Sequence, residues 1–97
     1  RELATRYGVL LMIDETHTFS AGLGGATGAW GLQPDIFVIG KSIGGGIPSG
    51  AYGISRAVAE AVNAHPEADL VDVGGVGGTL AGNALSVAAM RSCSLRK

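Results

Sequence analysis

Val9-Leu10-Leu11-Met12-Ile13 is a continuous apolar run that stops abruptly at Asp14. A run of this kind is typical of a strand that helices cover on both faces of a parallel sheet. Ile36-Phe37-Val38-Ile39 repeats the pattern and ends at Gly40-Lys41. The two runs therefore predict an α/β fold in which a mostly parallel sheet is flanked by helices.

Shorter signals around these runs predict the remaining elements. Leu3, Ala4 and Tyr7 share one helical stripe, and Gly8 follows where a helix commonly ends. Ser55 is a suitable N-cap for a helix over residues 56–63. Other expected elements are a glycine-rich loop over residues 20–31 anchored by Trp30, a tight reversal over 44–50, an extended segment over 51–54, a possible short strand over 70–73 and a helix over 81–91.

Length and composition indicate one domain or part of one. The chain has 97 residues, of which 17 are glycine, and only 15% are charged. The usual values are about 7% glycine and about 25% charged residues. A short chain with so few charges resembles a piece of an interior, so we expect residues 1–97 to form part of a larger domain.

Charge and cysteine content exclude several classes of protein. The net charge is −1 with no basic block, which argues against nucleic acid or an anionic membrane as a partner. Cys93 is the only cysteine, so no internal disulfide can form and a reducing, cytoplasmic compartment is expected. No apolar run approaches the roughly 20 residues that a membrane span needs.

The two candidate catalytic residues are the charged residues that follow the predicted strands. Ligands of open α/β sheets bind at the carboxyl ends of parallel strands, where Asp14 and Lys41 are expected, although strand-end charges are also commonly plain surface charges. Lys41 lies between an apolar strand and several glycines, and desolvation there favours the neutral amine that forms a Schiff base. Asp14 has no lysine or arginine close in sequence, which leaves it for a ligand cation. A carboxylate opposite a protonated ring nitrogen, with a lysine imine on the same ring, is the arrangement that suits pyridoxal phosphate.

Other motifs fail on inspection. Gly40-Lys41-Ser42 imitates the end of a phosphate-binding P-loop, but the earlier glycine of that motif falls on Asp35. The glycines from Gly75 lack the third glycine of a dinucleotide fingerprint, because that position is Leu80. The histidines have no partners at metal-ligand spacing, so no metal is expected, and no nucleophile elbow is present. A nucleotide-binding α/β module is accordingly a disfavoured alternative.

Three blocks in order resemble the class III aminotransferases, with the glutamate-1-semialdehyde aminomutase branch looking closest. They are Ile13-Asp14-Glu15-Thr16, the stretch GKSIGGGIPSGAYG over residues 40–53, and GTLAGN over residues 78–83. The resemblance runs from about Glu2 to Met90. It implies a pyridoxal-phosphate enzyme of the aspartate-aminotransferase fold (fold type I), of which this chain matches a central segment of the large domain.

The resemblance also implies roles for individual residues. Asp14 would pair with the pyridinium nitrogen of the cofactor. Lys41 would hold the internal aldimine and carry the proton between Cα and C4′. Thr16 stands where the family usually has a valine packed on the ring, which is a departure. Thr79, helped by the Gly78 backbone, would bind the cofactor phosphate of the neighbouring subunit, so a homodimer is implied.

Several alternatives stay open at this point. The substrate would be a small amino acid or amine and a keto compound, and aminotransferase, aminomutase and racemase chemistry all fit the quoted motifs. The family's phosphate loop and small C-terminal domain have no counterpart in residues 1–97, so the chain is expected to be an inactive fragment by itself. Glu15 is expected either to bond near the cofactor or to be solvated at a strand end. His17 is expected to be a solvated or core histidine rather than a residue that supports the site.

Overall fold

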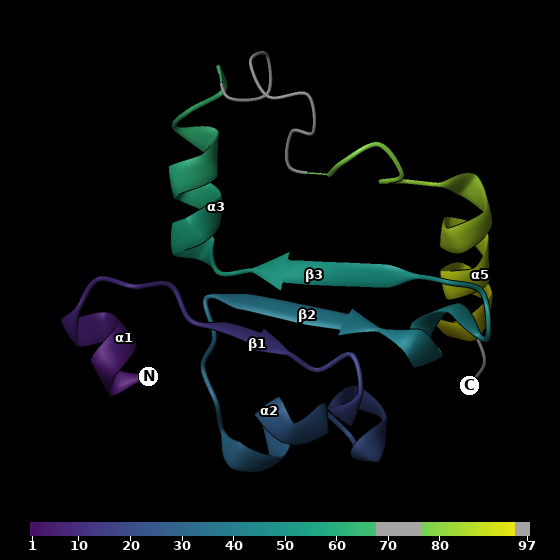
Figure 1. Cartoon of the computed structure of the whole chain (residues 1–97), viewed down its shortest axis with the longest axis horizontal. Coiled ribbons are helices and arrows are strands. Elements are labelled where there is room, and N and C mark those ends of the chain that lie inside the picture. The colour runs from purple at the N-terminus through teal and green to yellow at the C-terminus, as the bar shows by residue number, and fades with distance from the viewer. Residues whose placement is uncertain (68–76, 95–97) are drawn as a thin grey trace.

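The computed structural model describes residues 1–67 and 77–94, so the strand expected over 70–73 lies outside the described residues. Within these described ranges the elements are four α-helices, three strands and two short 3₁₀ helices, and Figure 1 shows how they are arranged. Their bounds, in chain order, are α1 (Glu2–Arg6), β1 (Met12–Asp14), η1 (Thr18–Ala21), α2 (Gly25–Trp30), β2 (Ile36–Gly40), η2 (Lys41–Gly44), β3 (Gly50–Ile54), α3 (Arg56–Asn63) and α5 (Ala84–Ser94).

The sheet has the order β1-β2-β3 and is mixed. β1 and β2 are parallel, with Asp14 opposite Val38, whereas β2 and β3 are antiparallel. The α/β fold is confirmed, but a mostly parallel sheet is not what these three strands form. The connection between β2 and β3 is short and rich in glycine, so β3 runs antiparallel to β2. A parallel neighbour would need a longer crossover connection.

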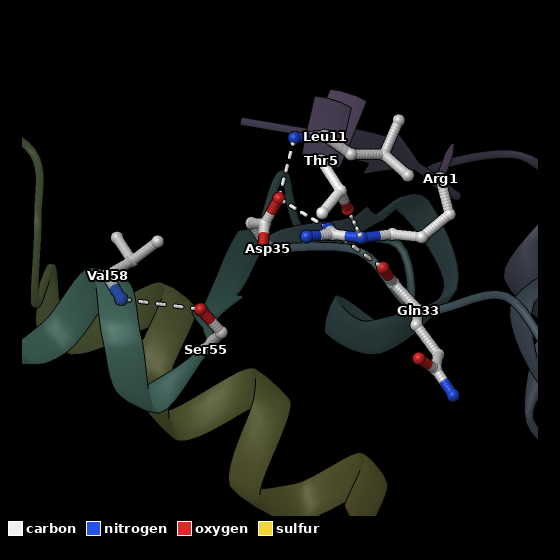
Figure 2. Close-up of polar contacts among 7 residues, drawn as sticks. All are labelled: Arg1, Thr5, Leu11, Gln33, Asp35, Ser55 and Val58. Carbon is white, nitrogen blue, oxygen red and sulfur yellow. Dashed lines mark hydrogen bonds and ion pairs between the residues drawn. The ribbon is translucent and has the colours of Figure 1, made fainter. Parts of the chain in front are cut away.

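Asp35 ties the starts of β1 and β2 together, as Figure 2 shows. Its carboxylate accepts the backbone N–H of Leu11 at 2.9 Å and pairs with Arg1 at 2.6 Å. Its own backbone N–H donates to the Leu11 carbonyl at 2.8 Å. The backbone of Leu11 therefore joins the two strands through Asp35. β1 itself begins at the next residue, Met12.

The loop expected over residues 20–31 is wrong, since η1 and α2 occupy most of it. Glu15, which comes directly after β1, accepts the backbone N–H groups of Ala26 and Thr27 in the first turn of α2. A side chain distant in sequence thus supplies the cap that no local residue provides. Trp30 does not anchor this segment, because its side chain is 73% exposed.

The two longer helices agree better with the sequence. Ser55 caps α3 by accepting the backbone N–H of Val58 at 3.3 Å, as predicted (Figure 2). α5 starts at Ala84, later than the predicted residue 81, because Asn83 is its cap and accepts the N–H groups of Leu85 and Ser86. Asn83 therefore fixes the first turn of α5.

Among the described residues, no hydrophobic side chain is buried. Met12 is 58% exposed and Val9 59%, although their run was expected to be covered on both faces. The radius of gyration is 15.2 Å, against about 13 Å for a compact domain of this length. Figure 1 gives the reason, since the helices lie around the edges and ends of the sheet and leave its faces open. The described residues therefore contain a sheet without a hydrophobic core.

Candidate active site

Asp14 and the residue after β2, Lys41, lie at the same edge of the sheet because β1 and β2 are parallel. Gly40 brings the two strand ends close together. A Cβ at Gly40 would lie 3.0 Å from Cγ2 of Thr16 and 3.3 Å from the Ser49 carbonyl oxygen. A side chain at this position would force Thr16 or Ser49 to move by a few tenths of an ångström, so glycine leaves room for the close approach of the two strand ends.

Asp14 is held as a carboxylate by Thr16. Its Oδ1 accepts the Thr16 hydroxyl at 2.5 Å and the Thr16 backbone N–H at 2.8 Å. The Thr16 hydroxyl, then the Thr16 N–H, and more weakly the charge of Lys41, lower the pKa of Asp14. Both of these hydrogen bonds fall on one oxygen, and within residues 1–67 and 77–94 no side chain or N–H donates to the other. An ionised oxygen therefore remains available at the strand edge.

Lys41 has an unusual backbone. It is the one non-glycine residue with positive φ, at +46°, in the part of the chain that the structure describes. Its side chain is exposed, so the desolvation expected for the Lys41 amine is wrong for this chain. Its Nζ lies 3.0 Å from Nδ1 of His17, which is solvent-exposed as expected but also contacts a predicted site residue.

Glu15 is buried, with 1% of its surface exposed, and is bound to α2. Besides the N–H groups of Ala26 and Thr27, it accepts the Thr18 hydroxyl at 2.9 Å. Hydrogen bonds from Thr27, Ala26 and Thr18 outweigh burial and lower the pKa of Glu15 to about 2. The expectation that Glu15 is solvated at the strand end is wrong, because the side chain is buried and bound to η1 and α2, whereas hydrogen bonding near a cofactor stays a prediction.

Gly78 and Thr79 lie apart from the other predicted site residues. They belong to the exposed segment before α5. Figure 1 draws this segment beyond β3, on the opposite side of the sheet from β1. The structure therefore brings together Asp14, Thr16 and Lys41 but not Gly78 and Thr79.

Sequence reasoning missed the contacts of Glu15 and His17. Glu15 is 11 residues from Ala26, and His17 is 24 residues from Lys41. Neither spacing corresponds to a local motif. The sequence carried only an indirect signal, a glycine at position 40 directly before Lys41, and its close approach to Thr16 is seen only in the structure.

No three of the His, Cys, Asp and Glu side chains in residues 1–67 and 77–94 gather where they could hold a metal ion. Over the same ranges, no helix is both long and apolar enough to cross a bilayer.

The family model described as "Aminotransferase class-III" matches residues 1–94. The chain belongs to the class-III aminotransferase family. It is 47% identical over 88 residues to the glutamate-1-semialdehyde 2,1-aminomutase of Aquifex aeolicus, covering 90% of this chain and 19% of that protein. Against the enzyme of the same name from Desulfatibacillum aliphaticivorans, identity is 41% over 90 residues, with coverage of 92% and 20%.

Solved structures agree with this class-III membership. A lysine-to-alanine variant of the glutamate-1-semialdehyde-aminomutase of Pseudomonas aeruginosa PAO1, in complex with PMP, superposes with a TM-score of 0.80 at 52% identity, over 95% of this chain and 21% of that one. A β-phenylalanine aminotransferase from Variovorax paradoxus gives 0.75 at 33% identity, over 100% and 21%. The chain thus spans about a fifth of the length of the relatives it matches.

Proposed function

We propose that residues 1–97 are the lysine-bearing part of the large domain of a pyridoxal-phosphate-dependent aminotransferase or aminomutase. The observation that carries this proposal is the placement of ionised Asp14 and of Lys41 at the carboxyl ends of adjacent parallel strands. The match over residues 1–94 supports the proposal and removes the reason to consider a nucleotide-binding module.

The residues present fit such a cofactor. Asp14 offers a carboxylate oxygen with no donor among the described residues, which suits a protonated ring nitrogen. Thr16 uses its hydroxyl to hold Asp14 and turns its methyl group toward Gly40, so we assign it to orienting Asp14. The amine of Lys41 is exposed at the same edge.

Pyridoxal phosphate, when bound, takes up the electron pair released as a proton leaves the substrate. Asp14 would keep the ring nitrogen protonated, because its lowered pKa keeps the carboxylate charged at neutral pH. Lys41 would bind the cofactor aldehyde through Nζ and, when released, would take and return the proton at that same atom. Gly78 and Thr79 would contact the cofactor phosphate in the site of a partner subunit, which is why they lie apart from Lys41 here.

The substrate we propose is a small amino acid or amine with a keto partner. The relatives named glutamate-1-semialdehyde 2,1-aminomutase, at 41–47% identity, favour movement of an amino group within one molecule. The β-phenylalanine aminotransferase, at 33% identity, is the example of the alternative reaction, in which an amino group moves from one molecule to another. We further propose a cytoplasmic homodimer, in line with the free, exposed Cys93.

Residues 1–97 alone are proposed to be inactive. A chain whose described residues bury no hydrophobic side chain lacks the main source of folding free energy. The purified 97-residue chain should therefore show no cooperative thermal transition. A sharp, cooperative transition of the purified chain would refute this, and measurable transamination by the same sample would refute it more decisively.

Borohydride trapping tests the proposed function. The complete protein containing residues 1–97 is incubated with pyridoxal phosphate, reduced and mapped by peptide mass spectrometry. We expect the label on Lys41 and its loss in Lys41→Ala. Lys97 is the other lysine of this sequence, so Lys97→Ala is the matched control and should label normally. A label on Lys97, or on no lysine, would refute the assignment.

A further inference from the structure

The side chains of His17 and Lys41 meet at the edge of the sheet. His17 comes between the end of β1 and η1, and Lys41 begins η2 directly after β2. The imidazole Nδ1 lies 3.0 Å from the lysine Nζ, within hydrogen-bond distance. As an ammonium, Nζ can only donate, so in that form of Lys41 the contact has Nδ1 as the unprotonated, accepting nitrogen of the ring.

The backbone on both sides holds this contact in place. Lys41 has a φ of +46°, a left-handed backbone that a residue with a side chain rarely adopts and that persists only where the surroundings fix it. Gly40 lets Thr16 pack against β2 at 3.0 Å from where a Cβ would be. His17 follows Thr16, and Lys41 follows Gly40. The close approach of the two strand ends therefore places the side chains of His17 and Lys41 next to each other.

The other ionisable groups around Lys41 are either engaged or placed on a different element. Asp14 interacts with it through charge, but both hydrogen bonds of Asp14 go to Thr16. Glu15 is bound to α2. Arg91 and Cys93 belong to α5, which packs on η2, and Cys93 lies beside Gly45. Of the residues that the structure describes, His17 is the one with a hydrogen-bonding contact to Nζ.

We infer that His17 is a positioning residue for Lys41, holding its amino group at the sheet edge whenever that group is not covalently engaged. The inference rests on the proposed function of Lys41. A lysine side chain has four rotatable bonds, so its amine otherwise samples many positions. An acceptor that narrows this range raises the rate of every step in which Nζ must meet the cofactor aldehyde or a proton.

Two replacements of His17 distinguish the effect of its hydrogen-bond acceptor from the effect of its side-chain volume. In His17→Asn the side-chain oxygen stands close to the position of Nδ1 and still accepts, whereas His17→Leu has no acceptor. Neither removes a cap, because the His17 side chain makes no capping bond to η1. His65→Leu is the control, since His65 bonds to Glu67 after α3.

The first measurement is the rate at which pyridoxal phosphate becomes trappable by borohydride on Lys41 in the complete protein. We expect a loss of roughly tenfold in His17→Leu, with His17→Asn and His65→Leu staying close to the wild-type rate. A wild-type rate in His17→Leu would overturn the inference, and so would an equal loss in His17→Asn. If the wild-type protein itself gives no label on Lys41, the proposed function fails instead.

The second measurement needs no cofactor. The ¹⁵N resonance of His17 Nδ1 is recorded in the cofactor-free protein and in Lys41→Met. Accepting a hydrogen bond moves an unprotonated ring nitrogen upfield, so the wild-type resonance should lie upfield of that in Lys41→Met, while His65 stays unchanged. Identical His17 resonances in the two proteins would overturn the inference even if labelling is normal.

Discussion

Replacing Gly25 with alanine tests whether Glu15 holds the start of α2. Gly25 has a φ of +60°, and a Cβ there would overlap the Glu15 carboxylate and lie 3.1 Å from Cα of Phe19. The left-handed backbone costs an alanine about 1–2 kcal/mol. Displacing packed neighbours costs about 1–3 kcal/mol more. Gly25→Ala should therefore destabilise this region by about 2–5 kcal/mol.

Gly8 provides a matched control. Its φ is +63°, but nothing lies within 4 Å of where its Cβ would be. Gly8→Ala should cost only the backbone contribution of about 1–2 kcal/mol, and it should do so at the end of α1. The difference between the two variants isolates the clash with Glu15.

Amide hydrogen exchange of the α2 peptide, in the complete protein containing residues 1–97, is the assay. We expect the Ala26 and Thr27 amides to exchange roughly 30-fold faster or more in Gly25→Ala, because 1.4 kcal/mol is a factor of ten. Adding Glu15→Ala should shrink the penalty, as in a double-mutant cycle. If α2 exchanges in Gly25→Ala as slowly as in wild type, Glu15 does not anchor the helix.

Three further predictions concern single contacts. Thr16→Val keeps the backbone N–H but removes the hydroxyl, so the pKa of Asp14 should rise toward its ordinary 3.8. A ¹³C titration of the Asp14 carboxyl group measures this, and a pKa equal to that of the wild type would contradict the hydrogen bond. The pKa of Glu15 is lowered from 4.5 to about 2, so its contribution to α2 is complete above pH 4.5 and lost as the pH falls toward 2. Exchange of α2, corrected for intrinsic rate, should accelerate over that range in wild type but not in Glu15→Gln, and equal profiles would disprove the anchor. Ser55→Ala should cost α3 about 1 kcal/mol by removing the cap on Val58, and an unchanged exchange rate in α3 would argue against it.

The elements that sequence predicted well depend on near neighbours. β2 follows from an apolar run, and α3 begins at Ser55 because its hydroxyl reaches an N–H three residues ahead. The positions of Asp14 and Lys41 could also be predicted, since Asp14 ends β1, Lys41 directly follows β2, and parallel strands end at one edge. Such features need only the chain itself and its local geometry.

The failures share a physical cause. Apart from Trp30, α2 consists of glycine, alanine and threonine, and it has no side-chain cap of its own, so its sequence is typical of a loop. It becomes a helix because the Glu15 carboxylate, 11 and 12 residues away, accepts its first N–H groups. Val9 and Met12 are exposed although their apolar run predicts burial. Whether a strand is buried depends on the elements that pack against its faces, and the sequence of the strand itself does not contain that information.

The amino-acid sequence by itself determined the family, the strands that lead to Asp14 and Lys41, and the glycines whose missing side chains let the strand ends approach. Tertiary structure alone decided that Glu15 would be an anchor and that His17 would meet the amine of Lys41. Sequence motifs and helix caps consist of residues a few positions apart, and the covalent chain fixes their relative geometry. A contact between residues 24 positions apart exists only after the strands have paired, because pairing sets which side chains share an edge.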